Sequence, residues 1–370
     1  MSQHFHSLRL KEKIQETEDS CSFIFEVPTE LKEAFSYTAG QYLTIKVEAK
    51  GQEHRRAYSI FTAPADNRLG VTIKRVKGGT VSNHLIDKVQ EGSALDVMLP
   101  EGRFIAKAEA GQQRDHYFFA GGSGITPVMS MIKTLLEQEP LSSCYLLYAN
   151  RNENSIIFKK TLDDFLLRYE GQFYMKYILS KPLQDKAGGL SGLFGKKAAP
   201  SWRGLKGRIN IDILDKYMDE HPSKTGKDVY YLCGPTGLMG TVENWLSGKG
   251  VENVQIKKEF FTNTVAEDSA VAAAPSAGEA CVVEVKLNGE TFSATIPAGK
   301  TVLDALIDLE KDPPFSCTSG ACSTCVAKVT SGSVEMDACF ALDDDEVADG
   351  YVLTCQARCQ TATLSIDFDA

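Results

Sequence analysis

The sequence predicts a multidomain fold: an antiparallel β-barrel, then an α/β domain built on a parallel sheet, then a small α+β domain. Three observations predict this order. Residues 1–110 hold short β-like segments broken by Gly and Pro, residues 111–262 alternate apolar strands with helical stretches, and residues 280–370 open on a hairpin pattern. Residues 263–279, NTVAEDSAVAAAPSAGE, are small, polar and Ala-rich, which predicts a linker before the last domain.

The first two domains follow from two different periodicities. Alternating and β-branched residues predict barrel strands at 22–27, 41–47, 71–76 and 94–99. In the second domain we expect parallel strands at 117–120, 144–149, 173–179 and 229–233, and helices at 126–137, 161–169, 212–218 and 237–246. The Gly- and Lys-rich run 186–208 has no periodicity. We therefore expect a surface excursion outside the sheet, with a functional basic flap as the alternative.

The third domain opens with two strand patterns, at 281–287 and 291–296, on either side of Asn288-Gly289. This dipeptide is a strong signal for a tight hairpin turn. A helical pattern at 301–309 follows, so we expect a small mixed sheet packed on one helix.

Composition and charge exclude several classes of function. The chain is 43% hydrophobic and 24% charged, as soluble globular proteins are, and no apolar run approaches the roughly 18 residues that span a membrane. The first residues lack the apolar core of a secretory signal, and ten Cys without a disulfide pattern suit a reducing cytoplasm. From Glu279 onward 16 acidic residues face 5 basic ones. This imbalance argues against nucleic-acid binding and suits a carrier that docks on positively charged partners.

Three cysteines lie close together in the segment SCTSGACSTC at 316–325, and a fourth follows thirty residues later. Cys317, Cys322 and Cys325 have C-x4-C-x2-C spacing, and together with Cys355 they match the ligand pattern of a plant-type [2Fe–2S] centre. Gly320 permits unusual φ values, so backbone N–H groups can turn toward the sulfides. Structural zinc usually takes two short Cys or His pairs, so the spacing favours iron–sulfur over zinc.

Two motifs in the first domain suit a flat, phosphorylated ligand. Arg55-Arg56-Ala57-Tyr58-Ser59 offers a guanidinium for a diphosphate, an aromatic ring for a planar ring system and a hydroxyl for a ring nitrogen. The R-x-Y-S pattern within it also recurs by chance. Gly78-Gly79-Thr80-Val81-Ser82 precedes a helical pattern, whose first N–H groups suit a phosphate. The alternative for this second motif is a plain turn with Ser82 as the helix cap.

Two further motifs lie at the ends of strands in the second domain. Gly122-Ser123-Gly124-Ile125-Thr126-Pro127 follows an apolar strand and opens a helix, the arrangement that binds a dinucleotide diphosphate. Cys233-Gly234-Pro235 ends a later strand, where parallel sheets bind ligands. A buried Cys before a turn is the alternative for this motif.

Together these motifs and Glu259-Phe260-Phe261, in this order and at these separations, resemble the ferredoxin–NADP reductase superfamily. The C-terminal segment resembles plant-type ferredoxins, which implies a β-grasp fold for residues 280–370. The resemblance covers nearly the whole chain apart from the linker and residues 186–208. Within the superfamily the chain is most similar to the reductase components of phenylacetyl-CoA epoxidase and related oxygenases.

The resemblance implies roles for residues of the first domain. The cofactor would be FAD rather than FMN. Arg56 would contact the flavin diphosphate, Tyr58 would pack on the flavin ring, and Ser59 would hydrogen-bond near its N5 atom. Gly78, Gly79 and Ser82 would cradle the diphosphate.

It likewise implies nucleotide contacts in the second domain. Gly122, Gly124 and Thr126 would hold the nicotinamide dinucleotide, and Cys233, with Gly234 and Pro235, would lie beside the nicotinamide. We expect Ser59, Cys233 and Glu259 to serve as the catalytic residues, and either Phe260 or Phe261 to cover the flavin. The long run at 186–208 departs from the family pattern close to these nucleotide contacts.

Nucleotide preference depends on a separate cluster of basic residues. Arg151 follows a predicted strand where the family reads the adenosine ribose, and a guanidinium matches a 2′-phosphate. Lys159, Lys160 and Lys181 add positive charge nearby. We therefore expect NADPH rather than NADH, the alternative being that Arg151 only decorates a loop.

Other candidate residues have plainer interpretations. Cys339 and Cys359 lack the ligand spacing, so we expect ordinary thiols. His84 is expected to be a helix residue. The acidic run Asp343-Asp344-Asp345-Glu346 is either a docking surface or the start of a helix, where carboxylates are favoured.

The sequence thus predicts an electron-transfer reductase. A hydride carries two electrons and a [2Fe–2S] centre takes one, so a flavin between them is needed to divide the pair. We expect a monomeric or weakly associating cytoplasmic protein that passes electrons from NADPH through FAD and the cluster to an oxygenase component. The oxygenase could be phenylacetyl-CoA epoxidase or another ring or alkyl monooxygenase. A non-catalytic redox sensor with the same cofactors is the alternative from another class.

Overall fold

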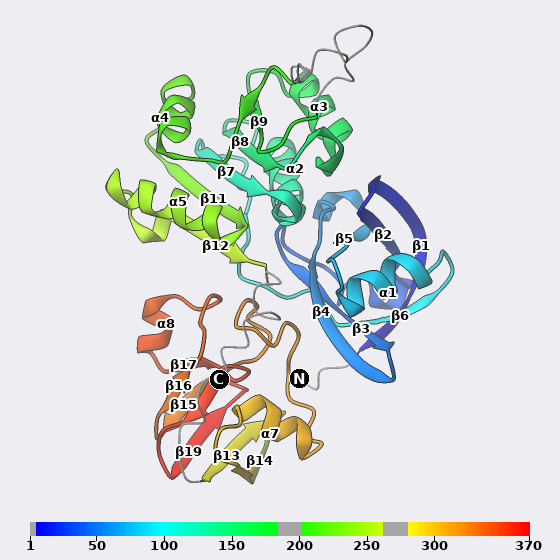
Figure 1. Cartoon of the computed structure of the whole chain (residues 1–370), viewed down its shortest axis with the longest axis vertical. Coiled ribbons are helices and arrows are strands. Elements are labelled where there is room, and N and C mark those ends of the chain that lie inside the picture. The colour runs from blue at the N-terminus through cyan, green and yellow to red at the C-terminus, as the bar shows by residue number, and fades with distance from the viewer. Residues whose placement is uncertain (1–4, 184–201, 262–279) are drawn as a thin grey trace, which may run out of the picture.

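The computed structural model describes residues 5–183, 202–261 and 280–370. Its described part forms three domains, and in the view of Figure 1 the third lies below the second and to the lower left of the first. The predicted linker and most of the run at 186–208 lie outside the described residues. The structure describes no helix long and apolar enough to cross a membrane within those ranges.

The first domain is an antiparallel barrel, as predicted. Its described strands form a six-stranded sheet in the order β4-β3-β6-β1-β2-β5, and the bridge between Ile60 and Val71 brings its two ends together. The elements are β1 (His6–Thr17), β2 (Ser20–Glu26), β3 (Tyr42–Ala49), β4 (Gln52–Ser59), β5 (Leu69–Lys74), α1 (Thr80–Lys88) and β6 (Ala94–Val97). Leu8, Leu43, Ile45 and Leu85 lie in its buried core, so α1 packs on the barrel.

The second domain is a parallel sheet with helices on both faces. The described strand order is β10-β9-β8-β7-β11-β12, and every pairing is parallel. The strands are β7 (Asp115–Gly121), β8 (Ser143–Asn150), β9 (Phe173–Leu179), β10 (Leu205–Lys206), β11 (Asp228–Gly234) and β12 (Ile256–Phe260). The helices are α2 (Ile125–Gln138), α3 (Lys159–Arg168), α4 (Ile211–Glu220) and α5 (Thr236–Gly248).

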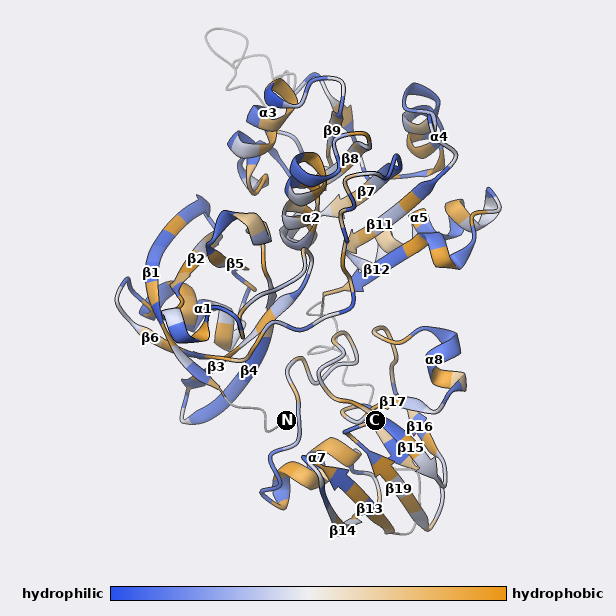
Figure 2. Cartoon of the chain, turned by 180° about the vertical axis from the view of Figure 1, so that it is seen from behind, coloured by the Kyte–Doolittle hydropathy of each residue, from blue (hydrophilic) through white to orange (hydrophobic). Residues whose placement is uncertain are grey.

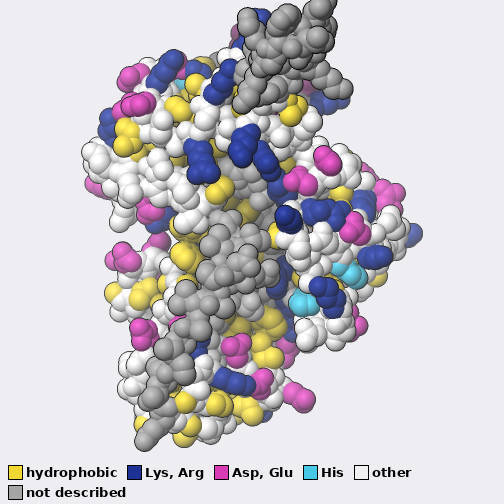
Figure 3. Space-filling view, in the orientation of Figure 1, with side chains coloured by type: hydrophobic (Ala, Val, Ile, Leu, Met, Phe, Trp, Pro, Cys, Tyr) yellow, Lys and Arg dark blue, Asp and Glu magenta, His cyan; other side chains and the backbone are white. Residues whose placement is uncertain are grey.

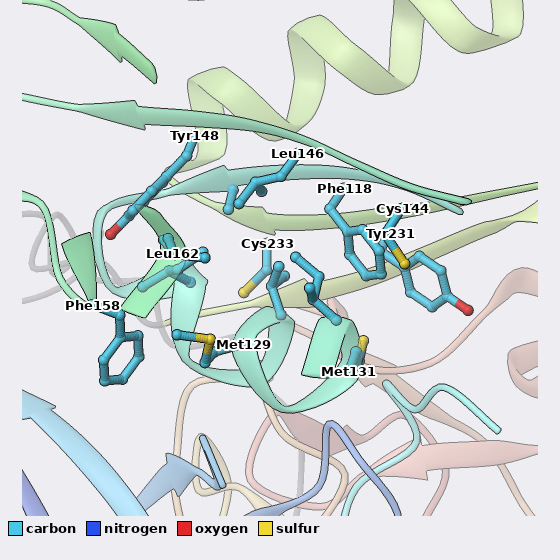
Figure 4. Packing of buried hydrophobic residues seen from close by; sticks show 14 of the residues in the cluster. Phe118, Met129, Met131, Cys144, Leu146, Tyr148, Phe158, Leu162, Tyr231 and Cys233 are labelled. Carbon is cyan, nitrogen blue, oxygen red and sulfur yellow. The ribbon is translucent and has the colours of Figure 1, made fainter. Parts of the chain in front are cut away.

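Successive side chains of the central strand point to opposite faces of this sheet. Phe118 packs in a core with residues of α2 and α3, whereas Tyr117 and Phe119 pack in a second core with residues of α4 and α5. Figure 4 shows the first of these cores, where Met129 and Met131 of α2 lie below Phe118 and Leu146 of the sheet. This two-sided burial explains why the central strands β7 and β8 are largely apolar.

The third domain has the mixed sheet that the hairpin pattern predicts. Its described strands have the order β14-β13-β19-β15-β17, with β13 and β19 parallel, and a small second sheet pairs β16 with β18. The elements are β13 (Cys281–Leu287), β14 (Glu290–Ile296), α7 (Val302–Asp308), β15 (Val326–Ser331), β16 (Val334–Met336), α8 (Asp344–Ala348), β17 (Tyr351–Leu353), β18 (Ala357–Cys359) and β19 (Thr363–Asp367). Buried and more exposed residues alternate along β13 and β19, so one sheet face packs on α7 (Figure 2).

Two expectations about the elements need correction. The run at 186–208 was expected to lie outside the sheet, yet Leu205–Lys206 forms the edge strand β10 and pairs with Ile178 and Leu179. A two-residue strand is too short to show any periodicity. Ser82 was the alternative cap of its helix, but Gly79 is the N-cap of α1 and Ser82 lies within the first turn.

Candidate functional site

A cavity of about 380 Å³ lies where the three domains meet. Its walls come from β4, β5 and the start of α1 in the barrel, from the start of α2 in the second domain, and from the cysteine loop of the third. The lining residues are Arg56, Ala57, Tyr58, Ser59, Thr72, Lys74, Val76, Gly79, Thr80, Val81, Ser82, Ser123, Thr126, Phe261, Cys317, Thr318 and Ser319. Motifs far apart in the sequence therefore meet at one cavity.

The barrel supplies the positive charge of this cavity. Arg56 and Lys74 are the basic residues among its described lining. The Arg56 Nη1 atom donates a hydrogen bond to the backbone oxygen of Arg55 at 2.8 Å, which orients the guanidinium. Tyr58 is half-buried and packs against the barrel core, and burial raises the pKa of its hydroxyl. This part of the cavity suits an anionic ligand that carries a planar ring.

Two helix N-termini add backbone donors. Helix α1 begins at Thr80, after Gly78 and Gly79, and Gly78 has a φ of +78° that favours glycine. The Ser82 Oγ atom accepts a hydrogen bond from Val76 N at 3.0 Å, which fastens the turn. Helix α2 begins at Ile125, and its Thr126 lines the same cavity together with Ser123, which lies in the 3-10 turn just before the helix. Such helix starts attract phosphate groups.

The glycine motif of the second domain allows a very close backbone approach. A side chain on Gly124 would place its Cβ atom 2.1 Å from the backbone oxygen of Cys233. A Cβ atom on Gly234 would lie 2.9 Å from Gly121 N. Gly122, with a φ of +54°, starts the 3-10 turn η3 (Gly122–Gly124). The glycines therefore let the ends of β7 and β11 meet, and Pro235 then caps α5.

Ser59, Cys233 and Glu259, the three predicted catalytic residues, lie at the junction of the first two domains. The Ser59 Oγ atom donates a hydrogen bond to Glu259 Oε2 at 3.3 Å, and Glu259 is the register partner of Cys233 across β11 and β12. Burial raises the pKa of Glu259 to about 8, although the hydrogen bond from Ser59 favours the ionised form. Burial, followed by the charge of Glu259, raises the pKa of the Cys233 thiol, which is fully buried.

The structure separates the two candidate phenylalanines. Phe261 lines the cavity. Phe260 lies against Phe340 of the third domain, with ring centroids 5.3 Å apart. Arg151, the predicted nucleotide-binding residue, is exposed just beyond β8 and is not among the residues of this cavity.

The four predicted cluster cysteines converge in the third domain. Cys322, Cys325 and Cys355 are buried, and Cys317 is half-buried. The Cys317 Sγ atom accepts hydrogen bonds from Ser319 N at 3.4 Å and Cys322 N at 3.3 Å. Hydrogen bonds from Cys322 and then Cys355 hold the pKa of Cys317 well below its usual value.

These features fit a [2Fe–2S] group, because thiolates and inward backbone N–H groups are what it requires. In the described ranges no three His, Cys, Asp or Glu side chains surround a position for a single metal ion. The fit to a [2Fe–2S] group therefore rests on the thiol ligands and on the convergence of the four cysteines. Gly320 has a φ of +75°, and a Cβ atom there would lie 2.8 Å from Ala338 O. Cys339 and Cys359 are half-buried, as ordinary thiols can be.

The acidic run is the start of a helix, one of its two predicted interpretations. Asp343 is the N-cap of α8, and its backbone N–H donates to Glu346 Oε2 at 3.0 Å. His84 lies in α1, as expected.

Sequence reasoning missed several residues of the site. Lys74 ends β5 and Ser123 lies inside the glycine motif, so a strand-end or motif signal was available for both. Thr318 and Ser319 were considered only as part of the cysteine loop. No local signal shows that this loop also closes the cavity, because the contact joins segments about 260 residues apart in the sequence.

Family models match each domain. Residues 7–105 match an oxidoreductase FAD-binding domain, residues 118–244 an oxidoreductase NAD-binding domain, and residues 285–360 a 2Fe-2S iron-sulfur cluster binding domain.

Curated relatives cover almost the whole chain. One component of the 1,2-phenylacetyl-CoA epoxidase of Escherichia coli K12 is 32% identical over 99% of this chain and 98% of its own. The ferredoxin reductase component of 3-ketosteroid-9-alpha-monooxygenase from Rhodococcus rhodochrous is also 32% identical, over 96% and 94%. Among solved structures, phthalate dioxygenase reductase is 25% identical over 98% of both chains, with a TM-score of 0.56.

Proposed function

We propose a specific electron path for this chain, which belongs to the ferredoxin–NADP reductase superfamily. It is one of the members that carry a C-terminal [2Fe–2S] domain and serve as reductase components of oxygenases. NADPH would give two electrons to FAD as a hydride, and the electrons would then pass one at a time through the [2Fe–2S] cluster to an oxygenase of the phenylacetyl-CoA epoxidase kind. The observation that carries the proposal is the shared cavity, which the flavin motifs, the glycine motif and the cysteine loop all line.

Each domain contributes residues to this path. Arg56 and the N-termini of α1 and α2 would hold the diphosphate groups, and Tyr58 and Phe261, which line the cavity, would lie at the flavin ring. Ser59 and Glu259, joined by their hydrogen bond, would orient the reacting edge, and the buried Cys233 would lie on the nicotinamide side. Cys317, Cys322, Cys325 and Cys355 would ligate the cluster. FAD when bound accepts two electrons as a hydride, and a [2Fe–2S] cluster carries one.

We propose NADPH as the preferred donor because of the charge beyond β8. Arg151 is exposed there, and its backbone oxygen accepts a hydrogen bond from Lys181 N at 2.7 Å, which keeps Lys181 close by. Lys160 is exposed in α3. In Figure 3 Lys and Arg side chains gather over the first two domains, whereas the third shows hydrophobic and acidic side chains with few basic ones. This division suits an anionic nucleotide on one part and a basic protein partner on the other.

The test is anaerobic reduction of the holoprotein. With NADPH, flavin bleaching should come first, followed by the electron paramagnetic resonance signal of a reduced [2Fe–2S] cluster, and added oxygenase should then reoxidise the cluster. Phenylacetyl-CoA should be consumed if the partner is the epoxidase, and turnover only with another ring or alkyl oxygenase would redirect the assignment. A protein whose cofactors are reduced but never passed on would be a redox sensor instead. Size-exclusion chromatography and cell fractionation test the proposed monomeric state and cytoplasmic location.

A further inference from the structure

Arg55 is a buried arginine that does not line the cavity. Its side chain is 9% exposed. The Nη2 atom donates to Asp312 Oδ1 at 2.9 Å, and the Nε atom donates to Glu53 Oε1 at 2.9 Å. The guanidinium carbon lies 4.2 Å from the ring centroid of Phe315 and 5.0 Å from that of Phe5. Two carboxylates and two aromatic rings thus hold one planar cation.

These partners connect the barrel to the cysteine loop. Glu53 and Phe5 belong to the first domain, whereas Asp312 and Phe315 belong to the third. Phe315 stands two residues before Cys317, and Cys317 itself lines the cavity. The backbone oxygen of Arg55 also receives the hydrogen bond from the Arg56 guanidinium at 2.8 Å. One dipeptide of β4 therefore contacts both the cavity and the segment that leads into the cluster.

We propose that Arg55 is a positioning residue for electron transfer from flavin to cluster. It fixes residues 312–316 against the barrel and so sets the position of Cys317 relative to the cavity. This inference rests on the proposed function, since it requires that electrons pass from the flavin to the cluster.

Arg55 suits this role better than lysine would. A planar guanidinium stacks on rings and forms directed hydrogen bonds to a carboxylate, whereas an ammonium group has neither property. Cation–π contacts are stronger when the charge is removed from water, as it is here. Loss of the contacts should lower the fraction of molecules in which the third domain is docked, and the transfer rate should fall in proportion.

The experiment compares the wild-type holoprotein with Arg55→Gln by anaerobic stopped-flow spectroscopy after mixing with NADPH. We expect flavin reduction and ferricyanide reduction at the wild-type rate, with iron content and cluster midpoint potential unchanged. Transfer from flavin to cluster should slow about tenfold or more. Arg55→Lys should give an intermediate rate, because it keeps the charge and loses the stacking. Cluster reduction at the wild-type rate in Arg55→Gln would overturn the inference, and so would a loss of iron or a shifted potential that accounts for the slower rate.

Asp312→Asn keeps the test decisive if Arg55→Gln does not fold. The Asp312 side chain is 68% exposed and its φ is +44°, a conformation that Asn tolerates. We expect a smaller slowing, about threefold, since the stacking on Phe315 remains. If Asp312→Asn folds and Arg55→Gln does not, a wild-type transfer rate in Asp312→Asn would overturn the inference.

Arg103→Gln is the matched control. Arg103 forms an ion pair with Glu346 across the same two domains, but the side chains are 50% and 31% exposed. Exposed pairs contribute little, so the transfer rate should stay close to that of the wild type. Equal slowing in both arginine variants would refute a specific role for Arg55. A wild-type protein whose cluster is never reduced by NADPH or NADH would instead refute the proposed function.

Discussion

The hydroxyl group of Tyr42 lies 2.8 Å from that of Thr324, and this contact joins the first strand residue of β3 to the loop between two predicted cluster ligands. Both side chains are buried, at 4% and 7% exposure. Glu101, which pairs with Tyr42 through backbone hydrogen bonds of 2.8 and 3.0 Å, adds a half-buried carboxyl group beside them. Burial raises the pKa of Glu101 to about 7. The barrel and the third domain thus share a buried polar contact next to the cluster loop.

Replacing Arg56 with Ala should release most of the FAD. Its guanidinium is oriented toward the cavity, and charge-assisted hydrogen bonds contribute about 1.5–3 kcal/mol each. Flavin absorbance per protein after desalting measures the effect. Arg68→Ala is the control, because Arg68 pairs with Glu12 outside the cavity and should leave the flavin bound. Full flavin content in Arg56→Ala would contradict the assignment.

Replacing Cys322 with Ser should remove the cluster and leave the flavin. Ferricyanide takes electrons directly from the flavin, so its reduction by NADPH should stay nearly intact, whereas cytochrome c reduction through the cluster should fall steeply. Visible absorbance and iron content report the cluster. Cys339→Ser should change neither activity, since Cys339 is a half-buried thiol outside the ligand set. A bleached cluster in Cys339→Ser would show that the ligand assignment is wrong, as would a joint loss of both activities in a Cys322→Ser protein that retains its flavin.

NADPH should give a higher kcat/KM than NADH, and Arg151→Ala should narrow the difference. A guanidinium bound to a 2′-phosphate contributes about 1.5–3 kcal/mol, which corresponds to about 10- to 150-fold in kcat/KM. The change should be confined to NADPH, because NADH has no 2′-phosphate. Steady-state kinetics with both nucleotides test this. Equal or better use of NADH by the wild-type protein would refute the preference.

Flavin reduction should depend on pH through Glu259. Its pKa of about 8 means that the carboxyl group is neutral at pH 7 and ionises as the pH rises past 8. A negative charge beside Ser59 opposes delivery of a hydride, so the rate should fall above pH 8. Stopped-flow measurement from about pH 6.5 to about pH 9.5, a range of roughly 1.5 units on either side of this pKa, reports the effect. Glu259→Gln cannot ionise, so the same pH profile in that variant would rule out Glu259 as the cause.

The same group links stability to pH. The pKa of Glu259 is about 8 in the folded chain, whereas an ordinary glutamate in the unfolded chain has a pKa of 4.5. Between these two values the folded chain holds a proton that the unfolded chain has released. The free energy of unfolding should therefore decline as pH rises through this window, and the contribution of the group is fully present only below 4.5. In Glu259→Gln the free energy of unfolding, measured by chemical denaturation, should decline less steeply with rising pH.

Residues 277–370, expressed alone, should fold and assemble the cluster. All four ligands and the hairpin lie within this segment, and its core is its own: Val283, Ile296, Leu306 and Leu364 pack together away from the barrel. Circular dichroism and the visible absorbance of the cluster test this. An insoluble or iron-free product would show that contacts such as that between Tyr42 and Thr324 are needed for folding.

Local chemistry made much of the fold predictable from the sequence. Asn288 and Gly289 have φ values of +55° and +80°, as the predicted tight turn requires, and the strand expected at 173–179 is β9. The missed strands are polar or short. β1 buries Leu8 and Leu10 among charged residues, β4 carries adjacent arginines, and β12 contains Lys257 and Lys258. Their pairing depends on neighbouring strands rather than on their own pattern.

The residues of the candidate site likewise fall into those that local motifs predict and those that depend on contacts between distant segments. Arg56, Gly79, Ser82 and Thr126 belong to local motifs, and the structure brings them to one cavity. The choice between Phe260 and Phe261 depended on where the third domain lies, which no local pattern encodes. The contacts of Arg55 and Tyr42 with residues more than 250 positions away were equally inaccessible.

The wall that Cys317, Thr318 and Ser319 contribute to the cavity has a consequence for side reactions. This wall belongs to a different domain from Arg56 and Tyr58, so its presence depends on docking of the third domain. If the cavity holds the flavin as proposed, the docked loop would screen the flavin from dissolved dioxygen. A variant that weakens docking would then lose reducing equivalents to dioxygen, which would be reduced to hydrogen peroxide. Tight docking would therefore conserve reducing equivalents as well as conduct them.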